Sequence, residues 1–359
     1  MSWEAMKLGD VLPFKYGRNL PESKRTQTGE YDVVTSAGVA GSHCEALTTV
    51  PSVVVGRKGT IGKLTYCDAP VWPTDTAFFV EERDGVNLRF AYYLLSTLPF
   101  QSMNNDSAVP GLNRRDAEDL IVRIPSLQEQ NSIADVLGAL DDKIAANQQV
   151  IQIVDELLAS VAKRTFLTTG SQILLSDVVD LHYGKSLPVE RRVDGAIPVV
   201  GSGGISGTHN EALIRDSTIV IGRKGTIGSV RWIEGPSFPI DTTYWVTSKE
   251  LPLEFVYQLL KAVDFAALNT DSAVPGLNRH NALAQSVPEV SLAEGIRFKE
   301  LTEPFRQRAQ MAIVENKTLA QARDELLPLL MNGKITIAEA KDEVEALGVD
   351  KHSEGAGHV

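Results

Sequence analysis

The chain is poor in cysteine and contains no long apolar run. Only Cys44 and Cys67 occur among its 359 residues, too few for a disulfide framework or a zinc site. No segment reaches the roughly 18 apolar residues of a membrane-spanning helix. The N-terminal sequence MSWEAMKLGD lacks the character of a signal peptide. We therefore expect a cytoplasmic protein without a membrane partner.

An excess of positive charge is also missing, since the formal net charge is −11. Residues 1–124 carry 13 basic and 15 acidic side chains, and residues 170–290 carry 10 and 13. Each of these near-neutral segments can still gather cations on one face. Counterion release, however, scales with the number of phosphates neutralised. We expect the chain alone to bind DNA weakly, and tight binding would require a more basic partner.

Motifs of catalysis are absent as well. The sequence has no P-D…(D/E)-x-K nuclease pattern, no phosphate-binding G-x-x-x-x-G-K-[ST] loop and no N-P-P-[YF] tetrapeptide of amino-methyltransferases. The segment GSGGISG at Gly201 departs from G-x-G-x-x-G because Ser206 replaces the third glycine. No acidic, histidine or cysteine cluster has metal-ligand spacing. These absences predict a recognition protein without catalytic residues, metal or cofactor of its own.

What the chain does contain is a long internal repeat. VVVGRKGTIG at residues 53–62 returns as IVIGRKGTIG at residues 219–228, and DSAVPGLNR at residues 106–114 returns at residues 271–279. Weaker matches, such as Tyr16 with Tyr183, extend the repeat at nearly constant spacing. A period of about 166 residues is far longer than that of solenoid arrays. It indicates two copies of one binding module and a target with two parts; a duplication without functional pairing is the alternative.

Each copy is predicted to be mixed and β-rich. Strand-like runs stand between glycine and proline residues, and two apolar segments have the periodicity of short amphipathic helices. The expected strands are residues 52–56, 63–67, 76–80, 217–222, 229–233 and 242–246, and the expected helices begin at Phe90 and Glu254.

Residues 126–169 differ in composition from the two copies, because they contain no proline and only one glycine. Ser126 and Glu129 form a capping-box pattern at the start. Apolar residues then follow 4-3 spacing, which predicts a long helix that requires a helical partner. The positions are Ile133, Leu137, Leu140, Ile144, Asn147, Ile151, Val154, Leu158 and Val161. Asn147 at a core position would fix the register at a cost in stability.

A second helical region follows the second copy. We expect it over about residues 300–331, with Asn316, Leu319 and Leu326 at core positions, Pro304 in its first turn and Pro328 at a kink or end. Ser291 and Glu294 repeat the capping pattern of Ser126 and Glu129. We expect the two helices to pair with each other, antiparallel; the alternative is that each packs on its own module.

The predicted fold class is α+β: two similar, β-rich globular modules joined by two long antiparallel helices, with pseudo-two-fold symmetry. The expected boundaries are 1–125 for the first module, 126–169 for the first spacer helix, 170–290 for the second module, 291–345 for the second spacer helix and 346–359 for a flexible tail. A 39-residue helix would measure about 58 Å, which exceeds one turn of DNA.

The repeated words also supply the candidate DNA contacts. Glycines beside arginine and lysine let a backbone approach DNA closely, and arginine can contact phosphate or guanine. The basic residues after SAVPGLN and the histidines beside Gly- and Ser-rich segments, taken as flexible loops, complete the set. The candidates are Arg57, Lys58, Thr60, Arg114, Arg115 and His43, with Arg223, Lys224, Thr226, Arg279, His280 and His209 in the second copy. The alternatives are a tight turn with solvated cations, a structural joint and exposed histidines without a role.

These segments resemble a known family. VGRKGTIG, SAVPGLNR and IPSLQEQNSIADVLGALDDKI are similar to the DNA-specificity subunits of type I restriction–modification systems. The order of module, helix, module and helix is also similar, up to about residue 335. The second helix start, VPEVSLAEGIRF, departs from the pattern because Gly295 stands where glutamine is expected.

The resemblance implies that each module reads one half of a bipartite double-stranded DNA target. It implies that the helices act as a spacer and bind two modification subunits, which carry the S-adenosylmethionine chemistry. A translocase–nuclease restriction subunit can then join. Competing interpretations are a self-sufficient DNA hydrolase, an adaptor that binds peptides or glycans, and an assembly of this family that only modifies DNA.

Overall fold

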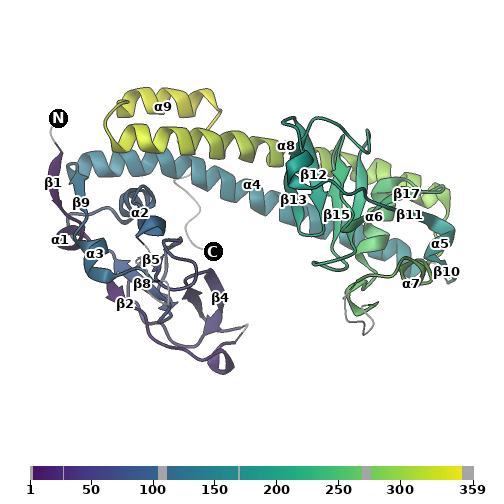
Figure 1. Ribbon diagram of the computed structural model, residues 1–359, viewed down its shortest axis with the longest axis horizontal. Coiled ribbons are helices and arrows are strands. Elements are labelled where there is room, and N and C mark those ends of the chain that lie inside the picture. Colours follow the sequence, from purple (N-terminus) through teal and green to yellow (C-terminus); the bar gives the residue numbers. More distant parts are fainter. Residues whose placement is uncertain (1–2, 27, 104–110, 169, 269–275, 350–359) are drawn as a thin grey trace. The chain divides into compact units, whose positions relative to one another are not determined.

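The computed structural model describes residues 3–26, 28–103, 111–168, 170–268 and 276–349. The chain forms two compact units, Met1–Asn147 with Val314–Val359, and Gln148–Ile313. Each unit contains one copy of the repeat and parts of the two long helices, α4 (Leu127–Thr168) and α8 (Leu292–Met331) (Figure 1). The two units therefore divide both helices, whereas the boundaries predicted from the repeat treat each helix as one segment.

The first unit is built on two small sheets. A four-stranded antiparallel sheet has the order β2-β8-β5-β6, and a three-stranded sheet has the order β4-β3-β7 with β3 and β7 parallel. The strands are β2 (Lys15–Tyr16), β3 (Tyr31–Thr35), β4 (Gly38–His43), β5 (Ser52–Gly56), β6 (Leu64–Cys67), β7 (Trp72–Pro73) and β8 (Ala77–Glu81). The first strand, β1 (Glu4–Lys7), pairs antiparallel with the last, β9 (Ile121–Ile124).

The second unit repeats this topology strand for strand. Its sheets have the orders β11-β17-β14-β15 and β13-β12-β16, and β10 pairs antiparallel with β18. The strands are β10 (Gln172–Leu174), β11 (Val179–Tyr183), β12 (Ile197–Gly201), β13 (Gly204–His209), β14 (Thr218–Gly222), β15 (Val230–Ile233), β16 (Phe238–Pro239), β17 (Thr243–Ser248) and β18 (Ser286–Pro288). The α+β class predicted from the sequence is confirmed.

Short helices complete each unit. In the first they are α1 (Leu8–Val11), η1 (Glu22–Lys24), α2 (Leu88–Ser96), η2 (Phe100–Ser102) and α3 (Arg114–Glu118). In the second they are α5 (Leu175–Val178), η3 (Val189–Arg191), α6 (Leu253–Lys261), η4 (Ala266–Leu268) and α7 (Arg279–Leu283). All six strands and both helices expected from periodicity are present, with ends that differ from the expected ones by at most two residues.

The central strand β5 shows why apolar runs predict these sheets. Val53 and Val55 belong to the main core cluster of the first unit, with Phe78 on β8 and Leu94 on α2. Val54 points to the opposite face and packs in a second cluster with Phe79. A strand buried on both faces must be apolar at consecutive positions, which gives the SVVVG run its character.

Helix α4 begins as its sequence predicts. The Glu129 carboxylate accepts from the Ser126 backbone N–H at 3.2 Å, and the Ser126 hydroxyl accepts from the Glu129 N–H at 3.4 Å. The predicted heptad positions are buried or partly buried along the whole helix, from Ile133 at 1% exposure to Leu158 at 7%. The heptad pattern was therefore a correct guide to the face that packs.

The two long helices pair with each other in the first unit. Buried Asn147 donates to the Asn316 side-chain oxygen at 3.0 Å and to Glu315 at 2.8 Å, and Asn316 donates to the Ile144 carbonyl at 3.3 Å. An ion pair joins Asp141 to Arg323 at 2.7 Å. Residues later in α8 contact residues earlier in α4, so the two helices run antiparallel, as predicted.

The alternative, packing on the modules, also occurs. In the first unit Tyr93 of α2 donates to Asp141 of α4 at 2.6 Å; burial, and then this hydrogen bond, raise the pKa of the Tyr93 hydroxyl. In the second unit Lys261 of α6 pairs with Asp155 at 2.7 Å, and Glu254 pairs with Arg306 of α8 at 3.1 Å. Each long helix thus contacts both its partner helix and a module.

Helix α8 starts earlier than predicted, whereas its end at Met331 agrees with the prediction. It starts at Leu292, since Ser291 and Glu294 form the capping box, so Pro304 lies in its interior and not in a first turn. It also continues past Pro328 to Met331. A turn then leads to α9 (Ile337–Ala346), whose Ala340 and Val344 pack in the first unit's core (Figure 1). Val349 is also buried there, and residues 350–359 of the predicted tail lie outside the described residues.

The buried Asn147 provides a test of the helix pairing. Replacing Asn147 with Ala leaves the Glu315 and Asn316 oxygens without their donor in a half-buried place, and we expect a loss of about 1–3 kcal/mol in the free energy of unfolding. The double variant Asn147→Leu/Asn316→Leu removes both partners and should cost much less. Urea unfolding of the purified proteins measures both values; equal losses would contradict the pairing.

Candidate nucleic-acid interface

The GRKG segment forms a tight loop after the central strand in both modules. Gly56 has no room for a side chain, because a Cβ there would lie 2.0 Å from the Thr60 carbonyl oxygen; Gly222 stands in the same relation to Thr226. The backbone N–H groups of Arg57 and Lys58 both donate to the Thr76 carbonyl, at 2.9 and 3.0 Å. This loop is therefore fixed, and the side chains of Lys58 and Thr60 at its tip are exposed.

The second repeated word lies beside the first. The Leu112 N–H donates to the Arg57 carbonyl at 2.8 Å, and the Leu277 N–H donates to the Arg223 carbonyl at 2.9 Å. The Asn113 and Asn278 side chains cap the short helices α3 and α7 that follow. The residues of these words at 106–110 and 271–275 lie outside the described residues.

In the first module an exposed tyrosine lies beside arginines from both repeated segments. The Arg57 guanidinium lies 5.1 Å from the centre of the Tyr16 ring, and Arg114 lies 5.8 Å from it. Both distances are within the range of a cation–π interaction. Tyr16 is 51% exposed. We name this group of an exposed tyrosine and two arginines the tyrosine–arginine platform.

The second module contains the same platform. Arg223 lies 5.0 Å from the centre of the Tyr183 ring, and Tyr183 is 53% exposed. Tyr183, Arg223 and Arg279 together line a cavity of about 390 Å³, with His280 at its edge. The Tyr244 hydroxyl donates to the Leu277 carbonyl at 3.0 Å. Burial raises the pKa of Tyr244 to about 12, so this donor stays protonated and holds the loop in place.

The remaining predicted DNA-contact residues differ in their exposure and in their distance from the platforms. Lys224, Thr226, Arg115 and His280 have exposed side chains near the platforms. The Gly- and Ser-rich segments expected to be flexible loops are β-hairpins instead, β3–β4 and β12–β13, because glycine at their turns and bulges allows the strands to pair.

The predicted position of His43 and His209 beside flexible loops is also wrong. His43 is partly buried against Trp72, with ring centres 5.3 Å apart. His209 is 7% exposed, and its Nδ1 accepts from the Val193 N–H at 3.1 Å. Both end a hairpin strand, and His209 cannot reach a base without leaving the fold. His209 therefore has a structural role.

Sequence reasoning missed Tyr16 and Tyr183 as site residues. Their recurrence at a spacing of 167 residues was visible, but nothing local in the sequence places either beside the arginines. Among the described residues no three His, Cys, Asp or Glu side chains gather as a metal site. In the same part of the chain, no helix combines the length and the apolar character needed to cross a membrane.

Comparison with known proteins finds similarity to one family. Residues 1–156 match the family model of the type I restriction modification DNA specificity domain. This part of the chain, 156 of its 359 residues, therefore has the sequence pattern of that domain. This match agrees with the family resemblance found in the sequence.

Two relatives and one solved structure are similar to this chain. A type I specificity subunit of Mycoplasma pneumoniae is 25% identical over 264 residues, 66% of this chain and 70% of the relative. The EcoprrI specificity subunit of Escherichia coli is 22% identical over 139 residues, 37% of this chain and 35% of that one. The S subunit of M. genitalium shares the fold, with a TM-score of 0.63 and 22% identity over 92% of this chain and 96% of the other.

Proposed function

We propose that this chain reads a bipartite DNA sequence, with one half-site contacted by each module through its tyrosine–arginine platform. The observation that carries the proposal is the repeated arrangement: in each module the GRKG arginine lies over an exposed tyrosine, and the LNR arginine lies over the same ring in the first module and lines a cavity with it in the second. Arginine held over a ring keeps its fork of donors oriented, which suits guanine edges and phosphates.

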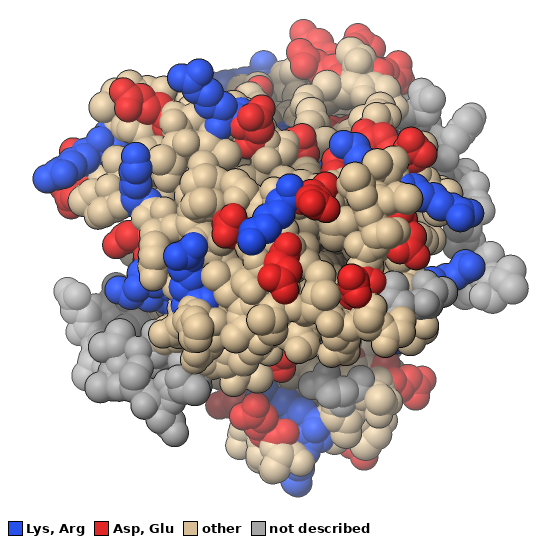
Figure 2. All heavy atoms as spheres, turned by 90° about the vertical axis from the view of Figure 1, so that its right-hand side faces the viewer, with Lys and Arg blue, Asp and Glu red and all other residues tan. Residues whose placement is uncertain are grey.

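The surface charge is consistent with a need for partners. On the face shown in Figure 2, Lys and Arg side chains are interspersed with Asp and Glu, without a field of one sign. A surface of this kind gains little from counterion release. We propose that two modification subunits supply further phosphate contacts and carry the S-adenosylmethionine-dependent adenine methylation, and that a restriction subunit joins this assembly.

The proposal is tested by mapping methylated adenines in DNA from cells that express this chain with its modification subunits. The expected motif has two short half-sites separated by a gap of fixed length, and it should change when this chain is replaced by another specificity subunit. A continuous motif, or methylation that does not depend on this chain, would refute the proposal. Modification without cleavage would identify an assembly that only modifies DNA.

The long helices offer apolar surface for the modification subunits. Leu301 and Phe305, one turn apart on α8, are 56% and 43% exposed, and Ile153 on α4 is 63% exposed. Exposed apolar groups on otherwise polar helices are typical of protein interfaces. We propose that these residues contact a modification subunit.

Charge placed on this surface should prevent assembly. The double variant Leu301→Glu/Phe305→Glu buries two unpaired carboxylates in the proposed interface, so we expect at least tenfold weaker co-purification with the modification subunits. Gln307→Glu adds one such charge at an exposed polar position of α8 and should assemble normally. Size-exclusion chromatography reports the result; normal assembly of the double variant would exclude this surface.

A further inference from the structure

The two platforms differ in their counter-charges. In the first module Glu118 forms an ion pair with Arg114, with 2.9 Å between Oε1 and Nε, and Glu81 forms an ion pair with Lys15. The strand registers, Lys15 opposite Phe79 and His182 opposite Trp245, match Glu81 to Thr247 in the second module. The helices RRDAE and RHNAL match Glu118 to Leu283. Both carboxylates of the first platform are therefore missing from the second.

Arg279, the counterpart of Arg114, is consequently left without a counter-ion in the part of the chain that is described. Its Nε is buried and has no hydrogen-bond partner there. Leu283 lies where the first module has a carboxylate, and it lines the same cavity as Arg279 and Tyr183. A buried donor without a partner costs free energy, and a bound anion would remove this cost.

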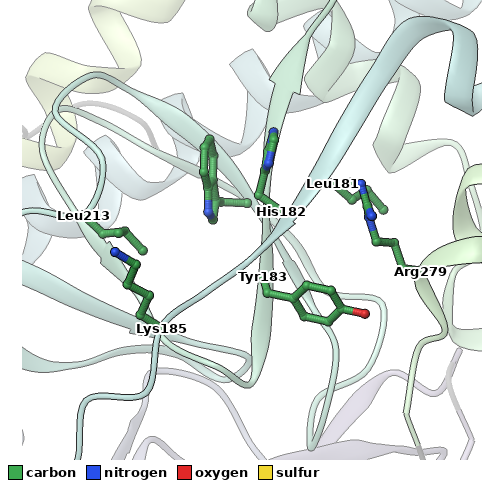
Figure 3. A pocket seen from close by; sticks show the side chains of 7 residues that line it. Leu181, His182, Tyr183, Lys185, Leu213 and Arg279 are labelled. Carbon is green, nitrogen blue, oxygen red and sulfur yellow. The ribbon is translucent and has the colours of Figure 1, made fainter.

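A second cavity of about 420 Å³ is also lined by Tyr183 and Arg279. Figure 3 shows Lys185 at one side of this cavity and Arg279 at the other, with His182 and Tyr183 between them. His182 is stacked on Trp245, with ring centres 4.1 Å apart, and its Nε2 lies 2.9 Å from the Thr247 hydroxyl. None of the described residues that line the cavity is acidic.

We infer that this cavity in the second module binds one phosphate group of the DNA backbone, and that the corresponding place in the first module does not. Arg279 and Lys185 supply the positive charge, and the Tyr183 hydroxyl supplies a further donor. Arginine binds phosphate through paired N–H groups, and lysine binds it as a point charge. In the first module Glu118 already pairs with Arg114, the counterpart of Arg279, and Glu81 adds a second negative charge beside Lys15, the counterpart of His182. The inference rests on the proposed function and adds to it an unequal share of the phosphate contacts.

A reciprocal exchange of charge tests the inference. Leu283→Glu gives Arg279 the carboxylate that Arg114 has, and Leu283→Gln is its neutral control of the same size. Glu118→Gln frees Arg114 and keeps an oxygen acceptor for the Phe14 N–H, which Glu118 accepts at 2.8 Å. The affinity of each assembled complex for its target duplex is measured by fluorescence anisotropy between about 50 and 200 mM KCl.

Each phosphate contact contributes about 0.9 to the slope of log affinity against log salt concentration. We expect Leu283→Glu to lower this slope by about one relative to Leu283→Gln, and Glu118→Gln to raise it by about one. Equal slopes for the two Leu283 variants would overturn the inference. If Leu283→Glu does not assemble, an unchanged slope for Glu118→Gln overturns it.

Two further outcomes are distinguished. A wild-type complex without sequence-specific binding would refute the proposed function itself, whereas specific binding with unchanged slopes refutes only the phosphate site. Inorganic phosphate, titrated into the DNA-free complex, tests for a free anion. Phosphate binding that Leu283→Glu abolishes, together with an unchanged slope on DNA, would assign the cavity to a free phosphate and overturn the DNA assignment.

Discussion

Replacing Arg57 with Ala is expected to weaken binding of the assembled complex to its target by about 1–3 kcal/mol, which is about 5- to 150-fold. The arginine lies over an exposed tyrosine on a loop that two hydrogen bonds to Thr76 hold in place. Its donors are therefore oriented before DNA arrives, and a variant loses this orientation along with the contact. The same result is expected for Arg223→Ala.

The two variants should differ in which half-site they affect. Sequence preference is measured with duplexes randomised in one half-site at a time: Arg57→Ala should relax one half and Arg223→Ala the other. Arg57→Lys keeps the charge but loses the paired donors, so it should recover non-specific affinity more than sequence preference. Arg123→Ala removes an exposed arginine of β9 and serves as the control. Unchanged affinity and unchanged preference in both platform variants would exclude these loops as contacts.

Lengthening the spacer is expected to lengthen the gap between the half-sites. Seven residues added to α4 after Asn147, with seven added to α8 before Val314, extend both helices by about 10 Å and keep the heptad phase. At about 3.4 Å per base pair this corresponds to about three base pairs. Methylation mapping gives the gap directly, because both half-sites are read from one motif.

The control for this experiment adds seven residues to the turn between α8 and α9, at residues 332–336, where no part of α4 is changed. That variant should recognise the original motif. A spacer variant that methylates the original motif, with its original gap, would show that the helices do not set the spacing.

The elements predicted from local patterns were largely right. Strands such as SVVVG and the heptad pattern of α4 depend on residues two, three or four positions apart, and burial in the structure follows the same periods. The start of α8 was misjudged because Gly295 and Pro304 are poor helix formers. The capping box at Ser291 and packing of Phe298 against Phe255 stabilise the helix there nevertheless.

The platform could be predicted only in part. Arg57 and Arg114 stood out because their words recur, but Tyr16 reaches them through the pairing of β2 with β8, which no local pattern specifies. The two histidines show the limit of the repeat. His43 and His209 occupy equivalent strand ends, yet His209 is buried at 7% exposure while His43 is only partly buried, because the residues packed around each copy differ.

The pairing of the first strand of each module with its last has a consequence for how such a chain can change. Since β1 lies against β9 and β10 against β18, the peptide leaves each module beside the point where it arrived. The sequence between these two strands can change without a new path for the helix that follows, as long as contacts to that helix such as those of Tyr93 and Lys261 are kept. One module can therefore change its sequence while the long helices and the other module stay the same. Under the proposed function, the DNA sequence preference of one module can change independently of the other.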